Sequence, residues 1–179
     1  YVRATGDTTI LEERVPFLEG SPLAPNDTDR YDSFKPTGKA YPLIDHCERA
    51  LDRVVLGSHG LPLMGAGDWN DGMDRVGREG RGESVWLAFF LYDVLTQFAG
   101  LARARGDLAF ADRCLLHARQ LQENIERHAW DGQWYRRAYF DNGLPIPTDF
   151  HGGEENFRSV DYMAIPFPPM QTLATLIFD

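Results

Sequence analysis

Residues 65–74, Gly-Ala-Gly-Asp-Trp-Asn-Asp-Gly-Met-Asp, place three carboxylates and one indole between glycines. This acidic loop (residues 65–74) is predicted to be neither helix nor strand, because its glycines disfavour both. Carboxylates beside an indole suit a carbohydrate: the ring stacks on a pyranose face, and the acids bind hydroxyl groups or protonate a glycosidic oxygen. A carboxyl group near apolar surface also has a raised pKa, which a general acid needs near neutral pH.

A calcium loop is one alternative interpretation of the same residues. Asp68, Asn70 and Glu79 fall at positions one, three and twelve of an EF-hand loop. Gly72 and Met73, however, stand where that loop needs a ligand and then a glycine. We therefore set the calcium interpretation aside.

A polar surface turn is the second alternative. Asn-Asp-Gly is a common turn sequence, and carboxylates are readily solvated. Against this, Trp69 is costly to expose, and apolar residues 61–64 lead into the loop. The residues by themselves leave the surface turn and the sugar-directed acid both open.

Composition narrows the class of protein and of ligand. The 179 residues are 43% hydrophobic and 25% charged, typical of a folded domain with a substantial core. The formal net charge of -9 disfavours nucleic acid and anionic membranes as partners, since both are bound through basic surfaces. A neutral ligand such as a sugar is compatible with this charge.

The two cysteines, Cys47 and Cys114, lie in separate helical patterns and are expected to be buried free thiols, which suits a reducing compartment. No C-x-x-C or H-E-x-x-H spacing occurs, so no metal site is expected. The longest apolar run, Val85–Tyr92, is too short to span a bilayer, and no signal peptide is apparent. We expect a cytoplasmic protein, and a piece of a longer one because the chain opens at Tyr1 rather than Met.

Hydrophobic periodicity and capping residues predict three helices. They span about Ala40–Leu56, ended by Gly57, then Gly82–Arg105, and then Asp107 to about Arg127. The second is apolar on every face in its first half and is expected to be buried all round, whereas the third is amphipathic. Gly20–Pro36 is predicted to be a long loop, and residues 134–141 a short hairpin or extended segment.

A small repeat links the helices. Arg3-Ala-Thr-Gly-Asp7 recurs as Arg103-Ala-Arg-Gly-Asp107, and in each copy glycine can end one helix while aspartate caps the next. A buried helix followed by a half-exposed one indicates two concentric layers. Repeated pairs of this kind predict a mainly α fold of the α/α toroid type.

Four motifs carry a family resemblance. Asp68-Trp-Asn-Asp-Gly-Met73 is preceded by His59-Gly-Leu-Pro-Leu63 and followed by Gly82-Glu-Ser-Val-Trp-Leu87 and Trp130-Asp-Gly-Gln-Trp-Tyr-Arg-Arg137. Together they resemble the glycoside hydrolase family 94 phosphorylases, of the cellobiose phosphorylase type, and most closely the C-terminal phosphorylase-like regions of cyclic β-1,2-glucan synthases. The resemblance covers about residues 1–145. It implies an (α/α)6 barrel with a substrate cleft at one mouth.

The resemblance also implies a reaction and its residues. The family cleaves β-linked glucosides by inverting phosphorolysis to α-glucose 1-phosphate, with inorganic phosphate as co-substrate and no cofactor. One carboxylic acid suffices, because phosphate arrives already anionic. On the family pattern Asp71 is that acid, Trp69 lies in the wall of the glucose subsite, and Asp68 and Asn70 position the loop.

Three further expectations follow. The family's barrel is longer than this chain, so residues 1–179 should form a partial barrel domain, inactive by itself, with a divergent tail over 146–179 where Ile165-Pro-Phe-Pro-Pro169 replaces a helix. Its open apolar edge favours a homo-oligomer. Gly77–Gly82 is either an anion site for phosphate or a solvated connection, and we favour the connection. The rival functions are a non-catalytic glucan-binding or structural module and a hydrolase.

Overall fold

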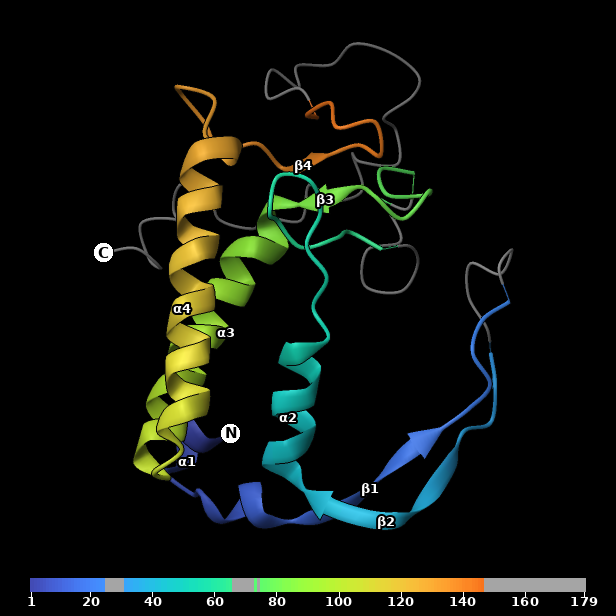
Figure 1. Cartoon of the computed structure of the whole chain (residues 1–179), viewed down its shortest axis with the longest axis vertical. Coiled ribbons are helices and arrows are strands. Elements are labelled where there is room, and N and C mark those ends of the chain that lie inside the picture. The colour runs from blue at the N-terminus through green and yellow to red at the C-terminus, as the bar shows by residue number, and fades with distance from the viewer. Residues whose placement is uncertain (25–30, 66–72, 74, 147–179) are drawn as a thin grey trace. The chain divides into compact units, whose positions relative to one another are not determined.

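The computed structural model describes residues 1–24, 31–65, 73 and 75–146. This part of the chain is mainly helical with a few short strands, as the sequence predicts (Figure 1). It forms two compact units, residues 1–54 and residues 55–179. The predicted tail over residues 147–179 lies outside the described residues.

The first unit holds a strand pair that the sequence did not reveal. Its elements are α1 (Val2–Thr5), the 3-10 helix η1 (Thr9–Glu12), β1 (Arg14–Glu19), β2 (Lys35–Pro42) and α2 (Leu43–Asp52). The antiparallel register runs from Arg14 opposite Pro42 to Glu19 opposite Lys35, with an irregularity between Pro16 and Leu18. Prolines within both strands hide the usual strand pattern. The predicted loop over residues 20–36 was therefore wrong at its end, where β2 begins.

Helix α2 is shorter than predicted at both ends. Residues 40–42 belong to β2, and the amide of Leu43 donates to the carbonyl of Glu13 at 2.8 Å, which begins the helix there. The helix ends at Asp52 with Arg53 as its C-cap, so Gly57 does not stop it. Gly57 instead begins the connection that leads toward the acidic loop.

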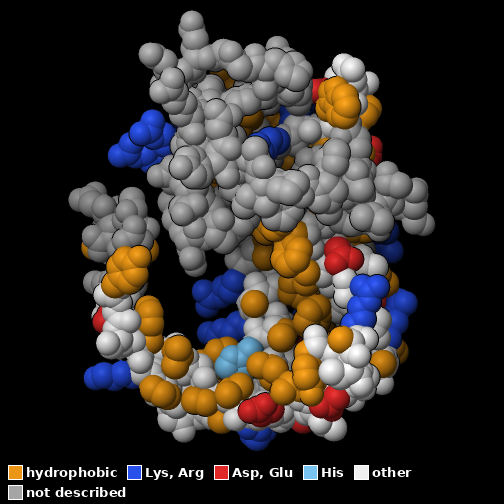
Figure 2. Space-filling model, turned by 180° about the vertical axis from the view of Figure 1, so that it is seen from behind, with side chains coloured by type: hydrophobic (Ala, Val, Ile, Leu, Met, Phe, Trp, Pro, Cys, Tyr) orange, Lys and Arg blue, Asp and Glu red, His pale blue; other side chains and the backbone are white. Residues whose placement is uncertain are grey.

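Helix α2 packs on strand β1 through an aromatic contact. The imidazole of His46 stacks on the ring of Phe17 at 3.8 Å, and its Nε2 donates to the carbonyl of Val15 at 3.1 Å. The guanidinium of Arg49 also lies over the Phe17 ring, 4.7 Å from its centroid. Hydrophobic side chains are visible along the β1–β2 hairpin in Figure 2. His46 therefore joins α2 to β1.

The second unit contains the two long helices that were predicted, α3 (Val85–Ala104) and α4 (Leu108–Asn124), continued by the π-helix η3 (Ile125–Ala129). Ser84 caps α3 by accepting from the amide of Leu87 at 3.1 Å. Asp107 caps α4 by accepting from the amide of Phe110 at 2.9 Å. Gly106, with φ 83°, makes the left-handed turn between the helices.

The same turn occurs at the start of the chain. Gly6, with φ 71°, ends α1, and the carboxylate of Asp7 accepts from the amide of Thr9 at 2.9 Å as η1 begins. The repeated motif therefore makes a glycine–aspartate turn in both copies, as predicted. The difference is that the first copy leads into a single 3-10 turn rather than a long helix.

Helices α3 and α4 lie side by side and bury one face each (Figure 1). α4 is amphipathic, as predicted: its apolar stripe holds Ala111, Cys114, Ala118 and Leu121, all buried, and Leu115, which is half-buried, and the buried Ile125 of η3 continues it. Phe90 of α3 is 52% exposed, so the prediction of burial on all sides was wrong. Among the described residues, α3 contacts α4, η3 and β4, and these neighbours leave Phe90 exposed.

Two expectations from the apolar residues are also tested here. Among the described residues, α3 alone is long and apolar enough to cross a membrane, judged by length and composition, although its eight-residue apolar run had appeared too short. This helix packs against α4 on one face. Both cysteines are free, with Cys114 buried and Cys47 half-buried.

Two short strands complete the second unit. Strand β3 (Glu83–Ser84) immediately precedes α3 and pairs antiparallel with β4 (Ala138–Tyr139). After β4 the chain turns through Asp141-Asn-Gly143, where Gly143 has φ 79° and the amide of Phe140 donates to the carbonyl of Leu144 at 2.8 Å. The predicted hairpin near residues 134–141 is therefore present, with its strand limited to two residues.

Candidate functional site

The four sequence-predicted site residues lie outside the described residues. They are Asp68, Trp69, Asn70 and Asp71, in the middle of the acidic loop. The structure does describe the residues on either side of them, which fix where the loop leaves the fold and where it returns. The candidate site is therefore built from these flanks.

Both flanks of the acidic loop are anchored in one small apolar cluster. Met64 precedes the loop, and Met73 and Val76 lie at its end; they are 4%, 6% and 4% exposed. They pack together with residues from the β4 hairpin, Ala138 and Ile146. We call these five residues the methionine cluster. It brings the start and end of the acidic loop to one place beside β4.

The preceding flank also runs beside β3. The amide of Ser84 donates to the carbonyl of Pro62 at 2.8 Å, and the amide of Met64 donates to the carbonyl of Gly82 at 2.7 Å. Leu63 and Glu83 form the antiparallel bridge between these two bonds. Residues 62–64 therefore act as a third short strand, which fixes the direction in which the chain enters the acidic loop.

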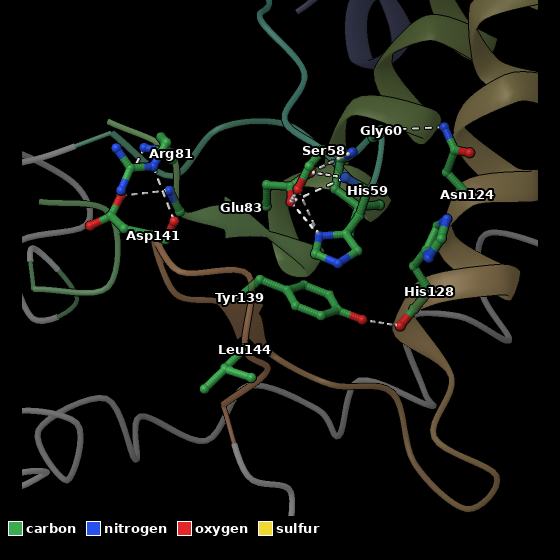
Figure 3. A network of polar contacts seen from close by, with 12 residues as sticks. Ser58, His59, Gly60, Arg81, Glu83, Asn124, His128, Tyr139, Asp141 and Leu144 are labelled. Atoms are coloured by element: carbon green, nitrogen blue, oxygen red, sulfur yellow. Dashed lines mark hydrogen bonds and ion pairs between the residues drawn. The ribbon is translucent and has the colours of Figure 1, made fainter. Parts of the chain in front are cut away.

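Glu83 connects this frame to the turn before it. Its side chain is 1% exposed, and its carboxylate accepts from the amides of His59 at 3.0 Å and Leu61 at 3.2 Å. The Nδ1 of His59 lies 2.5 Å from the same carboxylate, and the hydroxyl of Ser58 donates to it at 3.4 Å. Figure 3 shows these donors converging on Glu83. A buried carboxylate with this many donors holds the turn in one conformation.

The imidazole of His59 is held from its other side by aromatic contacts. It stacks on the ring of Tyr139 at 3.9 Å and meets the ring of His128 edge-on at 5.3 Å. The hydroxyl of Tyr139 donates to the carbonyl of His128 (Figure 3), and the guanidinium of Arg136 donates to the same carbonyl at 2.7 Å. Burial, with the charges of His59 and Arg127, lowers the pKa of the His128 imidazole. These contacts join η3, β4 and the 58–61 turn.

The Gly77–Gly82 segment binds an anion, but the anion belongs to this chain. The carboxylate of Asp141 accepts from the amides of Glu79 at 2.9 Å, Arg81 at 2.8 Å and Gly82 at 2.9 Å (Figure 3). The guanidinium Nε of Arg81 donates to the Asp141 carbonyl at 3.1 Å. Residues 78–81 are exposed, as expected for the solvated connection that we favoured, and an internal carboxylate ties this connection to the β4 hairpin.

This arrangement sets the pKa of Asp141. Burial acts to raise the pKa, but the three amides and the Arg81 charge outweigh it, so the pKa lies below the usual 3.8. A lowered folded-state pKa contributes stability that is fully present above about 3.8 and is lost as the pH falls through the folded-state value.

The change Asp141→Asn is expected to weaken this link by about 1 kcal/mol at neutral pH. Asparagine has an NH₂ group in place of one carboxylate oxygen, so it can accept these hydrogen bonds at one oxygen and not at two. Hydrogen exchange of peptides covering residues 75–84 should accelerate accordingly. The difference from the unaltered protein should shrink as the pH falls below about 3.8, after correction for intrinsic exchange rates. Asp112→Asn, at an exposed pair with Arg103, is the matched control. An equal effect of both changes would contradict the assignment.

The aromatic segment after η3 packs through Tyr135, whereas Trp130 is 39% exposed. Tyr135 contacts Phe89 at 5.1 Å and Trp130 at 4.9 Å, and its hydroxyl donates to Glu126 at 2.6 Å. Burial and the Glu126 carboxylate raise the pKa of Tyr135, which keeps the phenol protonated. Trp134 is 48% exposed. In the part of the chain that the structure describes, no group of three or more His, Cys, Asp or Glu side chains is arranged to hold a metal ion.

The family is shown by sequence comparison. Residues 1–156 match the catalytic domain of the glycosyl hydrolase 94 superfamily, and the chain belongs to that family. This confirms the resemblance drawn from the four motifs. The match takes in the acidic loop, both of its flanks and the β4 hairpin.

Individual relatives refine the picture. The chain is 40% identical over 156 residues to the cyclic beta-(1,2)-glucan synthase NdvB of Rhizobium meliloti, covering 85% of this chain and 5% of that protein. It is 35% identical over 149 residues to the solabiose phosphorylase of Paenibacillus borealis, covering 82% of the chain and 17% of the relative. A 3-O-beta-D-glucopyranosyl-beta-D-glucuronide phosphorylase of the same organism is 32% identical over 145 residues, covering 80% and 17%. The chain thus spans a small part of each relative.

Sequence reasoning missed Glu83 and Asp141 as site-forming residues. Glu83 stood in the Gly82–Leu87 motif without an assigned role, and Asp141 stood at the end of the predicted hairpin segment, also without one. No local signal marks Glu83, because its partners in residues 58–61 are separated from it by the whole acidic loop.

Proposed function

We propose that this chain carries the general-acid region of a β-glucan phosphorylase that cleaves β-linked glucosides by inverting phosphorolysis. The observation that carries the proposal is the family match over residues 1–156, which includes the entire Asp68–Asp71 motif. Relatives that share the region are named as phosphorylases of glucosides, and one is named as a cyclic β-1,2-glucan synthase. The anchored flanks support the proposal, because a catalytic group must be held in a defined position. A loop whose two ends are fixed restricts the positions that such a group can take.

In the proposed mechanism Asp71 donates its proton to the glycosidic oxygen as the bond to the anomeric carbon breaks. Inorganic phosphate attacks that carbon from the opposite face, so the products are α-glucose 1-phosphate and a sugar with a free hydroxyl group. One acid is sufficient, because phosphate needs no base to become a nucleophile. Trp69 contributes apolar surface to the glucose subsite, and Asp68 and Asn70 position the loop.

The rest of the site is proposed to come from a longer protein. The chain spans 5% of the glucan synthase relative and 17% of the two phosphorylases. We place the chain within an (α/α)6 barrel, of which α3 and α4 form one helix pair, with the residues that bind phosphate supplied by other parts of the barrel. The role in the cell would be cytoplasmic adjustment of glucan chain length during cyclic β-1,2-glucan synthesis.

The test measures glucose 1-phosphate released from β-1,2- and β-1,4-gluco-oligosaccharides in the presence of phosphate. It uses this chain and the longest natural protein that contains it. Phosphate-dependent release by the longer protein supports the proposal and identifies the linkage. Release of free glucose at the same rate with or without phosphate would instead favour a hydrolase.

The non-catalytic rival is a glucan-binding or structural helical module. It predicts sugar-dependent quenching of tryptophan fluorescence without turnover, and loss of that quenching in Trp69→Ala. A folded longer protein that binds oligosaccharide but releases no sugar phosphate would favour this rival over the phosphorylase.

A further inference from the structure

We propose that Glu83 is a positioning residue for the general acid, acting through His59 and the strand-like residues 62–64. The proposal rests on the function proposed above, in which Asp71 donates the proton. It assigns Glu83 no contact with substrate. Its role is to fix the conformation of the chain that enters the acidic loop.

The geometry that carries the proposal is the convergence of side-chain and backbone contacts at one buried residue. The carboxylate accepts from two amides and an imidazole in residues 59–61, while its own backbone pairs with Leu63 and with Tyr139. Gly57 packs so closely that an added Cβ would lie 2.5 Å from the Glu83 side chain. Glu83 therefore joins residues 57–63 to β3 and β4. That segment ends two residues before the acidic loop begins.

A structural role alone would not require a carboxylate at this place. A buried charge is costly unless it is fully paired, and a neutral acceptor would satisfy the two amides. The charge is accounted for by His59, whose Nδ1 lies 2.5 Å from the carboxylate and whose ring stacks on Tyr139 and meets His128 edge-on. The Glu83–His59 pair thus fixes a ring that contacts η3 and β4, and with it the path of residues 59–64.

The decisive substitution is Glu83→Gln, which keeps the shape of the side chain. One oxygen can still accept from the amides of His59 and Leu61. The other position becomes an NH₂ group, so His59 Nδ1 must accept instead of donate, and the contact must lengthen from 2.5 Å to an ordinary hydrogen bond near ~2.9 Å. We expect kcat of phosphorolysis to fall about tenfold or more, because a small misplacement of a reacting group is costly. The KM values for phosphate and oligosaccharide should stay within about twofold.

The assay uses the longest natural protein that contains this chain and compares four forms: unaltered, Asp71→Asn, Glu83→Gln and Glu123→Gln. Glu123 is exposed on α4 and provides the same chemical change at a site without a proposed role. Thermal unfolding is recorded for each form, so that a loss of folded protein is separated from a loss of turnover. If Glu83→Gln does not fold, His59→Phe takes its place, since it keeps the ring stack and the main-chain bond to Glu83 but removes Nδ1.

The outcomes separate the two proposals. A folded Glu83→Gln form with reduced kcat, unchanged KM and an inactive Asp71→Asn form supports the positioning role. Unaltered kcat in Glu83→Gln, or in His59→Phe where that replaces it, overturns the role while leaving Asp71 in place. A proportional rise in KM also overturns it, because that would indicate a general loss of the binding site. If the unaltered protein releases no glucose 1-phosphate, the proposed phosphorylase function is wrong.

Discussion

Replacing Asp71 with asparagine is expected to lower phosphate-dependent glucose 1-phosphate release by about a thousandfold. Asparagine keeps the size and hydrogen-bonding capacity of the side chain but has no proton to donate at neutral pH. The glycosidic oxygen would then leave as an unprotonated alkoxide, which is a poor leaving group. Sugar binding should be nearly unaffected, so kcat falls far more than KM rises.

The measurement is steady-state phosphorolysis of the β-linked oligosaccharide that the unaltered longer protein accepts. Asp112→Asn, exposed on α4, is the matched control and should retain full activity. Asp68→Asn is the informative neighbour, because the two aspartates of Asp-Trp-Asn-Asp are separated by only two residues. An inactive Asp68→Asn form beside an active Asp71→Asn form would assign the acid to the other aspartate.

The long helices of the second unit were predictable because their signals are local. The stripe on α4, the cap Asp107 and the turn glycine Gly106 all lie within one stretch of sequence, and the structure confirms each of them. The glycine–aspartate turn at Gly6 was found for the same reason. Local propensity and side-chain periodicity act over a few residues, so one sequence is enough to recognise them.

The β1–β2 hairpin was missed because its evidence is not local. Its strands are joined across residues 20–34 and contain prolines, which lower strand propensity. The helical pattern that followed was then extended backward over residues 40–42. Pro42 ends β2, and the helix begins one residue later, at Leu43. Only pairing with residues 14–16 distinguishes these alternatives, and pairing is a tertiary effect.

The residues of the candidate site also differ in whether their signal is local. The acidic loop was singled out from ten consecutive residues, and the chemistry proposed for it comes from those residues and a family resemblance. The groups that hold the loop in place were not, because Glu83 and Asp141 bind amides that lie 22 to 62 residues away. A carboxylate that satisfies backbone amides has no preferred spacing to them, so neither residue could be recognised by a motif. Its role becomes visible once the fold brings the segments together.

Gly82 is the point where those segments meet, and its replacement by alanine is expected to cost about 3 kcal/mol of local stability. A Cβ at this position would lie 2.5 Å from the carbonyl oxygen of Val76 and 2.6 Å from the Cα of Gly77. Both are backbone atoms, so no side chain can rotate to make room. The buried glycine also accepts from the amide of Met64 at 2.7 Å and donates to Asp141 at 2.9 Å.

The expected consequence is that both flanks of the acidic loop loosen together. If Gly82 moves away from Val76, its hydrogen bonds with Met64 and with Asp141 are both expected to lengthen. Hydrogen exchange should accelerate in peptides covering residues 61–65, 75–84 and 138–146, with little change in α4. Gly100→Ala is the matched control, since no atom lies within 4 Å of its added Cβ and alanine favours a helix by about 1 kcal/mol. The same chemical change is therefore expected to destabilise the loop frame at residue 82 and to stabilise α3 at residue 100. Unchanged exchange around Gly82 in the alanine form would show that Val76 and Gly77 can move apart without disturbing the frame.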